Sequence, residues 1–465
     1  MQTENIEDIY NLTPVQKGIL FHSLYAPEFG QYIFQTTFTL RGSLNVAAFK
    51  RAWQKVVERH TILRTGFYWE EAEQPLQIVY KQVKVPLELY DWSDINPGEQ
   101  QRKLNSFLKS DRQQGFDLSQ ASLMRLTLFQ LGKDVHEFVW SRHFIVADGW
   151  SIPLILGEVV QIYEALSQGT EVFLEPSFPF RKYLDWFEQQ DVNKAEMFWR
   201  KQLKGVKAPT PLTNLLADNL NQQEKYDDEQ ITLSDATTSK LHAFARQHQL
   251  TINTLIQGAW TILLSRYSGY EEVVYGCTVS GRPVDLVGSE SIVGMLVNTL
   301  PVRVKVNSEK YLLSWLKELQ SQLLEMRQYE YSSLVDVQGW SEVPRNISLF
   351  DSIVVFENLP VPENLRENHS RILQVVDSNN FYKTNYALTL VIIPEFPLTL
   401  GINYDFSRID TVIINNILEH LNRLLEGMVA NHEVCLKDLL LFTEQKPDTQ
   451  LLMLEKEMSH NFDFV

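Results

Sequence analysis

One stretch in the first half of the chain decides how the rest is interpreted. Residues 140–151 read Trp140-Ser141-Arg142-His143-Phe144-Ile145-Val146-Ala147-Asp148-Gly149-Trp150-Ser151. This pattern predicts the end of a strand, a turn at Asp148-Gly149 and the start of a helix. Segments that join a strand to a helix often display reactive side chains. We therefore expect a functional site in this loop.

Length and composition predict a large folded protein with two lobes. The chain has 465 residues, more than the ~250–300 at which a single core stops growing. Hydrophobic residues make up 44% and aromatic residues 11%, which is enough to build large cores. We expect an N-terminal lobe over residues 1–175, a connecting helical segment rich in proline and aromatic residues over 176–208, and a C-terminal lobe over 209–465.

Charge and cysteine content exclude several classes. The formal charge of −16 disfavours binding to nucleic acid phosphates. The acidic, polar start and the lack of a long apolar run predict a protein with neither signal peptide nor membrane span. Two isolated cysteines, Cys277 and Cys435, favour a reducing, cytoplasmic setting. No glycine-rich phosphate loop or zinc spacing is present, so we expect no intrinsic cofactor and no metal.

Helices and strands are interleaved in both halves, which predicts a mixed α+β fold. Thr13 and Asn45 are typical helix N-caps. Further helices are expected over 150–166, 253–267 and 410–429. Extended segments are expected over 61–69, 77–80, 122–130, 135–142, 230–233, 272–278, 352–356, 386–393 and 398–404.

Several motifs in fixed order carry a family resemblance. Besides residues 143–149, they lie at 12–22 (Leu-Thr-Pro-Val-Gln-Lys-Gly-Ile-Leu-Phe-His), 59–67, 183–186, 293–300, 349–352 and 356–358. The ordered set resembles condensation domains of nonribosomal peptide synthetases. That resemblance implies two lobes, each like chloramphenicol acetyltransferase, in a V shape with a tunnel between them.

The resemblance also implies partners and a reaction. Donor and acceptor peptidyl carrier domains would enter from opposite ends, each bringing a substrate on a phosphopantetheine arm, and an adjacent adenylation domain is expected. The acceptor amine would attack the donor thioester to form a peptide bond. The chain is most similar to the subtype that takes a D-configured donor in the sequences of residues 18–22, 329–331, 340–344 and 384–386.

Phe144 is the main departure from the family. It occupies the place of the second histidine in His-His-x-x-x-Asp-Gly, which by resemblance handles a proton or orients the amine. A phenyl ring can do neither. His143 is a doubtful substitute, because neighbouring residues of a strand point to opposite faces; a structural role is favoured. A natural variant, a degenerate domain and a deliberate His-to-Phe change fit the sequence equally.

The other candidate residues have structural and functional alternatives. By resemblance Asp148 pairs with Arg282 and holds the loop in shape; locally it would cap the helix that follows. Gly149 would permit a tight turn and bring its amide near the reacting carbonyl, or be an ordinary turn glycine. Trp150 would line the tunnel or support its wall.

Two polar residues outside the loop are expected near the tunnel. Arg64 lies in an apolar segment and needs a partner, so a structural salt bridge is favoured over catalysis. Asn298 would line the channel or satisfy a strand end. Cys277 has no activating base beside it and reads as a core residue.

Three functions remain open from the sequence. The primary hypothesis is an amide-forming acyltransferase, a condensation domain whose activity is impaired by Phe144 or lost. The second is a condensation-like domain that docks carrier proteins or recruits a tailoring enzyme without catalysis. A free-standing acyltransferase is the third.

Overall fold

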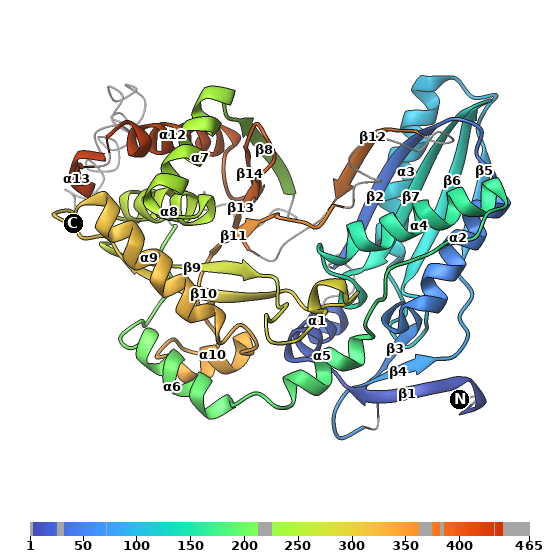
Figure 1. Cartoon of the computed structure of the whole chain (residues 1–465), viewed down its shortest axis with the longest axis horizontal. Coiled ribbons are helices and arrows are strands. Elements are labelled where there is room, and N and C mark those ends of the chain that lie inside the picture. The colour runs from blue at the N-terminus through green and yellow to red at the C-terminus, as the bar shows by residue number, and fades with distance from the viewer. Residues whose placement is uncertain are drawn as a thin grey trace, which may run out of the picture.

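The computed structural model describes residues 3–25, 32–70, 72–212, 226–361, 374–381, 386–431 and 433–439. It consists of two lobes that meet at the bottom of Figure 1 and diverge upward as a V, which confirms the predicted mixed α+β, two-lobe fold. Within the described ranges, no helix is both long and apolar enough to cross a membrane.

The N-terminal lobe is built on a five-stranded sheet in the order β12-β2-β7-β6-β5. Its strands are β2 (Ile33–Arg41), β5 (Leu87–Asp91), β6 (Met124–Gly132), β7 (Val135–His143) and, from far along the chain, β12 (Gln374–Phe381). Helices α2 (Val46–Arg59) and α4 (Ser151–Gln168) pack on one face. There the ring centres of Trp53 and Trp140 lie 5.0 Å apart. Helix α3 (Pro97–Gln114) covers the other face through Asp111, which accepts a hydrogen bond from Ser141.

A small sheet closes the base of this lobe. It has the order β1-β4-β3, formed by β1 (Ile6–Asn11), β4 (Leu76–Tyr80) and β3 (Thr65–Tyr68). Helix α1 (Pro14–Tyr25) lies at the centre of the molecule, close to the junction of the lobes (Figure 1).

The C-terminal lobe has a six-stranded sheet in the order β10-β9-β11-β13-β14-β8. Its strands are β8 (Tyr226–Thr232), β9 (Glu272–Val279), β10 (Asn298–Lys305), β11 (Ser352–Phe356), β13 (Leu388–Ile393) and β14 (Thr399–Asp405). Its helices are α7 (Asp235–His248), α8 (Ile252–Ser268), α9 (Leu312–Arg327), α10 (Leu334–Trp340), α12 (Thr411–Ala430) and α13 (Leu436–Leu439). Helix α8 is buried along most of its length and forms the centre of this core.

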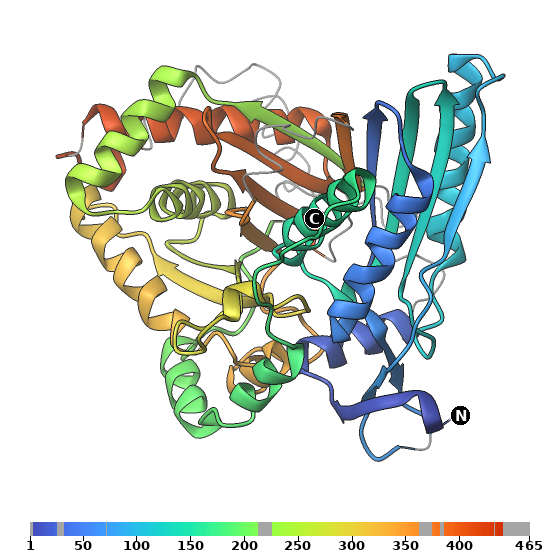
Figure 2. The same ribbon diagram turned by 45° about the vertical axis from the view of Figure 1, so that its right-hand side comes forward.

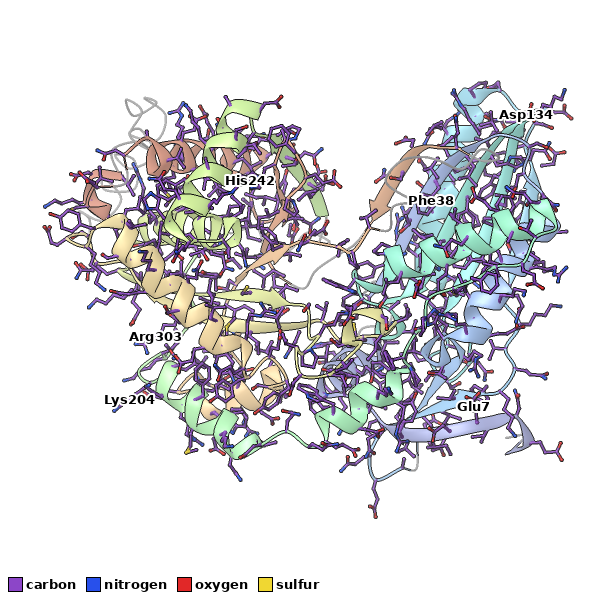
Figure 3. The ribbon with its side chains drawn as sticks, viewed as in Figure 1. Glu7, Phe38, Asp134, Lys204, His242 and Arg303 are labelled. Atoms are coloured by element: carbon purple, nitrogen blue, oxygen red, sulfur yellow. The ribbon has the colours of Figure 1, made fainter. Side chains whose placement is uncertain are left out.

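Among the described residues, the helical connector and strand β12 both link the lobes. The predicted helical connector consists of α5 (Phe180–Phe187) and α6 (Val192–Gln202), and Arg303 of β10 fastens its end by donating to the carbonyls of Gln202 and Lys204 (Figure 3). Strand β12 returns from the second half and pairs antiparallel with β2 (Figure 2). The lobe boundaries at 175 and 208 stay a prediction.

Local sequence signals placed several elements correctly. Asn45 caps α2 by accepting from Ala48 N, and the helices predicted over 150–166, 253–267 and 410–429 correspond to α4, α8 and α12. The extended reading of 61–69 is wrong in its first part. Residues Thr61–Arg64 form a 3-10 turn because the Thr65 hydroxyl donates to Thr61 O and Arg64 Nε donates back to Val57 O of α2.

Candidate active site

The loop after β7 is short and held by several hydrogen bonds. A 3-10 turn, η4 (Phe144–Val146), follows the strand and leads into Asp148, Gly149 and α4. Gln16 of α1 donates from Nε2 to Ile145 O at 3.3 Å and to Gln77 Oε1. The opening motif of the sequence therefore supports this turn, a role that sequence reasoning did not assign to Gln16.

Asp148 is the polar centre of the site. It has no exposed surface, and Arg282 donates to both of its carboxylate oxygens, Nη1 to Oδ2 at 2.9 Å and Nη2 to Oδ1 at 3.1 Å. Oδ1 also accepts from Ser151 N at 2.9 Å, and Oδ2 accepts from the amides of Leu296 and Val297. The predicted Arg282 pair is confirmed, and the local cap at the start of α4 is present as well.

This network joins distant parts of the sequence. Asp148 belongs to the N-terminal lobe, whereas Arg282 and residues 294–297 lie between β9 and β10 of the second half. A buried carboxylate with a bidentate arginine and three amide donors is well compensated for its loss of hydration. The pair therefore holds the loop of one half against the other.

His143 has a structural position. Its Nδ1 accepts from Ile145 N at 3.2 Å, so in the neutral ring Nε2 carries the proton and faces Ser23 Oγ at 3.3 Å. Burial lowers the pKa of His143 to about 3. Both nitrogens are occupied and the ring stays neutral at pH 7, so His143 offers no free lone pair for proton transfer. These contacts favour the structural reading of His143.

Phe144 offers a hydrocarbon surface. Its ring is partly buried and stacks on Phe34 of β2, with ring centres 4.6 Å apart and planes at 18°. Its amide donates to Tyr32 O at 2.8 Å, which holds the start of η4 against β2. The side chain can pack against a substrate but has no atom that binds a proton.

Gly149 and Trp150 lie at the junction of the lobes. Gly149 is exposed, and a Cβ placed on it would meet only Leu359 of the second half, at 3.9 Å. Gly149 lies in a turn, and its φ is outside the left-handed region, so this backbone conformation does not require glycine. Trp150 donates from Nε1 to Glu290 O at 3.0 Å, and its ring centre lies 5.2 Å from the guanidinium carbon of Arg282.

Asn298 and Arg64 serve the scaffold. Asn298 Nδ2 donates to the carbonyls of Glu330 and Ser332, and its Oδ1 accepts from Thr299 N, so both polar atoms of the amide group have partners. Arg64 donates to Glu7 at 2.6 Å and to Tyr80 O. Glu7 lies on β1 at the outer base of the N-terminal lobe (Figure 3), so the salt bridge exists but lies away from Asp148.

The structure reveals two buried ionisable residues that sequence reasoning did not single out. Arg142 is 6% exposed on β7, two residues before Phe144. Glu330 has one enclosed carboxylate oxygen without a partner, and burial raises its pKa to about 7. Arg142 lies in the 140–151 stretch and Glu330 in the 329–331 motif, but sequence reasoning assigned neither residue a role of its own. Burial of a charged residue can be seen only in the fold. Cys277 is buried with its pKa raised to about 12, which confirms it as a core thiol.

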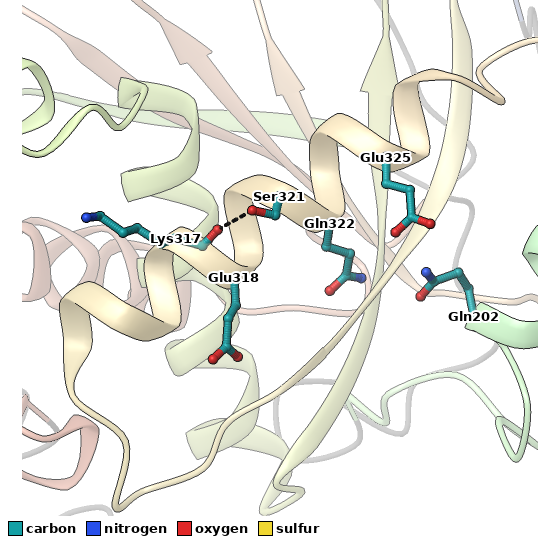
Figure 4. Close-up of a pocket in the computed structure, with 6 residues that line it drawn as sticks. All are labelled: Gln202, Lys317, Glu318, Ser321, Gln322 and Glu325. Carbon is teal, nitrogen blue, oxygen red and sulfur yellow. Dashed lines mark hydrogen bonds between the residues drawn. The ribbon is translucent and has the colours of Figure 1, made fainter.

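A surface hollow on the C-terminal lobe is separate from this site. It is formed by Gln202 of α6 and by α9 side chains, shown in Figure 4: Lys317, Glu318, Ser321, Gln322 and Glu325. One hydrogen bond joins these residues, from Ser321 Oγ to Lys317 O. No residue of the 140–151 loop lines it, so it contributes nothing to the candidate chemistry.

Comparison with known proteins identifies the class. The family model described as Condensation domain matches residues 6–452. The chain is 43% identical over 447 residues to one of the linear gramicidin synthase subunits of Brevibacillus parabrevis, covering 96% of this chain and 6% of that protein. It is 32% identical to tyrocidine synthase 2 of the same organism, covering 99% of this chain and 13% of that protein.

Solved structures show the same fold. A four-domain nonribosomal peptide synthetase bound to AMP and glycine superposes with a TM-score of 0.77 at 18% identity, covering 93% of this chain and 34% of that one. The X-domain from teicoplanin biosynthesis superposes with a TM-score of 0.75 at 20% identity, covering 94% of this chain and 98% of that one.

The family match and the curated relatives define the class, an amide-forming acyltransferase. The chain belongs to the condensation-domain family of nonribosomal peptide synthetases, whose reaction is peptide bond formation. It spans only 6% and 13% of the two curated relatives quoted above.

Proposed function

We propose that this chain condenses two carrier-bound substrates. The acceptor is an aminoacyl group and the donor a peptidyl or aminoacyl thioester, each held on the phosphopantetheine arm of a carrier domain in a longer synthetase that also contains an adenylation domain. The observation that carries the proposal is the intact Asp148–Arg282 network. It keeps the loop in one shape at the junction of the lobes, where two arms entering from opposite ends of a tunnel would meet.

The reaction needs a nucleophile and charge stabilisation. The amine lone pair forms the C–N bond, the carbonyl electrons move onto oxygen, and the C–S bond then breaks as thiolate leaves and the nitrogen loses a proton. Gly149 supports this step because it is exposed at the junction and no described residue accepts a hydrogen bond from its amide. A free amide in such a place suits a developing oxyanion.

We propose that Phe144 slows the reaction without abolishing it. The sequence motif assigns this position to the family's proton-handling histidine, which is typically worth ~10²–10⁴-fold. An acceptor α-amine has a pKa of ~7.7–8.0, so part of it is neutral near pH 7.5. Holding two tethered reactants together contributes effective molarities of ~10⁵–10⁸ M. Proximity alone can therefore sustain turnover.

The proposed donor is D-configured. Support comes from the sequences of residues 329–331 and 340–344, which resemble those of the D-donor subtype. Of the motif at 384–386, Thr384 and Asn385 lie outside the described residues. Tyr386 is within them and stacks on Phe350.

A second candidate is a non-catalytic recruiting domain. It is favoured by Phe144 and by one structural neighbour, the teicoplanin X-domain, which has been solved in complex with OxyB. That neighbour is 21% identical to this chain with a TM-score of 0.73.

The test is a condensation assay with loaded carriers. Donor carriers bearing D- or L-aminoacyl groups are mixed with a loaded acceptor carrier and this chain, and dipeptide is measured by mass spectrometry. The proposal expects slow, enzyme-dependent dipeptide with a preference for the D-donor. Saturable carrier binding without product from any pair would support recruitment instead, and tight, salt-dependent binding of DNA or RNA would contradict both candidates.

A further inference from the structure

Arg142 is a buried cation beside the loop. It lies on β7 in register with Phe34 of β2 and Met124 of β6. It is 6% exposed, and burial lowers its pKa to about 9, so it still carries a charge at pH 7. Its side chain donates a hydrogen bond to Thr36 Oγ1 at 3.0 Å. No carboxylate among the described residues forms an ion pair with it.

The other deeply buried arginines differ in this respect. Within the described part of the chain, Arg64 and Arg282 are as buried as Arg142, yet Arg64 pairs with Glu7 and Arg282 with Asp148. The guanidinium carbon of Arg142 instead lies 4.4 Å from the Trp140 ring centre and 5.9 Å from that of Phe34. Cation–π contacts offset part of the lost hydration. They leave the positive charge without an opposing negative one.

The guanidinium of Arg142 is not sealed. No described residue accepts from its Nε or Nη2, and neither nitrogen is among the fully enclosed polar atoms that lack a partner. By contrast, Arg282 Nε is such an enclosed atom. Arg142 Nε and Nη2 therefore have no acceptor among the described residues, and the protein does not fully enclose them.

The charge of Arg142 is close to the place that Phe144 leaves apolar. Phe34 contacts both residues, 5.9 Å from the Arg142 guanidinium carbon and 4.6 Å from the Phe144 ring centre. The distance from the Arg142 guanidinium carbon to the Phe144 ring centre therefore cannot exceed the sum of these two distances. At roughly 10 Å and an effective dielectric constant of about 20, a unit charge changes an equilibrium or rate about tenfold.

We propose that Arg142 supplies the positive charge that stabilises the oxyanion formed when the acceptor amine attacks the donor thioester. This rests on the proposed condensation function. Arg142 neither gives nor takes a proton: the amine forms the C–N bond, the carbonyl oxygen holds the negative charge, the C–S bond breaks, and the proton leaves nitrogen with the thiolate or water. The charge substitutes for part of the help that the missing histidine would supply.

The first test measures that charge directly with a thiol. In a Cys435→Ser background, Phe144→Cys places an ionisable group at the site, and the pH dependence of its alkylation by iodoacetamide reports how readily an anion forms there. Cys277 stays silent because burial raises its pKa to about 12. Among the described residues, His143 and Asp148 flank this position in the loop, and Tyr32, whose carbonyl accepts from the Phe144 amide, links it to His22 and Tyr386.

The expected result is a shift of the alkylation profile. The thiol introduced by Phe144→Cys should ionise about one pH unit lower than in the same protein carrying Arg142→Met. Arg125→Met is the matched control, because Arg125 lies on the same sheet but pairs with Asp111 across the other face; it should leave the profile unchanged. Superimposed profiles with and without Arg142 would overturn the proposal.

The second test uses native Phe144. Arg142→Met should lower the rate of dipeptide formation about tenfold without changing the carrier concentration at half-saturation, and Arg142→Lys should recover part of the loss. An unchanged rate would overturn the proposal. A clear thiol shift without dipeptide from any carrier pair would support the charge effect and remove the condensation function. Dipeptide formation without a thiol shift would support the condensation function and overturn the proposed role of Arg142.

Discussion

Two buried arginines near one loop have opposite surroundings. Arg282 donates to both oxygens of Asp148 and to Ile292 O, and the carboxylate it binds accepts further amides. Arg142 has one hydroxyl acceptor and two aromatic rings. The charge of Arg282 is neutralised in holding the lobes together. The charge of Arg142 stays available beside Phe144, so the same residue type serves architecture in one place and electrostatics in the other.

Introducing an imidazole at position 144 is expected to have the largest effect. Under the proposed function, Phe144→His supplies the positioned base of the family motif and should raise dipeptide formation ~10²–10⁴-fold. The measurement is initial rate across pH 6–9 with loaded carriers. Phe38→His, on the same sheet and labelled in Figure 3, is the control and should give no gain. Equal rates for the native protein and Phe144→His would mean that catalysis rests on proximity.

Removing each arginine should separate their roles in stability. Arg282→Met leaves the Asp148 carboxylate buried without its cation and should cost about 3–5 kcal/mol. Arg142→Met replaces an unpaired buried cation by a hydrocarbon and should be neutral or stabilising by about 1 kcal/mol. Urea unfolding followed by fluorescence compares the two midpoints. Equal losses would show that Arg142 has a partner as strong as Asp148.

Glu330 predicts a loss of stability as pH rises. Its folded pKa of about 7 exceeds the ordinary value of 4.5 because of burial, so the folded state holds a proton that the unfolded state has released. The stabilising contribution is complete below about pH 4.5 and is lost as pH rises through 7, roughly 3 kcal/mol in all. Because His143 has the opposite pH dependence over part of this range, the test uses a His143→Gln background: its unfolding midpoint should fall between pH 5 and 8, and adding Glu330→Gln should remove most of that slope.

His143 predicts the opposite slope at lower pH. Its folded pKa of about 3 lies below the ordinary 6.5, so below pH 6.5 the unfolded chain gains a proton that the folded protein does not. Stability should therefore fall by roughly 2 kcal/mol between pH 7 and 5 from this residue. His143→Gln should reduce the loss, whereas His242→Gln, exposed on α7 (Figure 3), should not.

The smallest effect is expected at Gly149. Because its φ is ordinary and only Leu359 lies near the position of an added Cβ, at 3.9 Å, Gly149→Ala should change stability by less than about 0.5 kcal/mol and keep the amide donor. Gly281→Ala is the contrasting variant. Its φ is +63° and a Cβ would lie 1.7 Å from Leu296 O, so it should unfold far more easily. A large loss in Gly149→Ala would mean that the loop tolerates no added methyl group.

The outcome at individual residues shows how far sequence reasoning reaches. Residue order was sufficient for the family, for the strand-turn-helix at 140–151 and for the Asp148–Arg282 pair, which the structure confirms. It was insufficient for the turn at Thr61–Arg64, where hydrogen bonds to a preceding helix replace a strand. It also did not find α3, although Asn96 and Pro97 mark its start as a cap and first turn.

By itself, the sequence determined the local elements and the motif residues, because helix caps, strand patterns and spaced motifs depend on neighbours within a few positions. Only the tertiary structure decided that β12 joins a sheet of the other lobe, that both nitrogens of His143 are occupied, and that Arg142 has no acid partner among the described residues. Partners and desolvation depend on residues more than a hundred positions apart, such as Ser23 and His143. Those distances in sequence close only when the chain is folded.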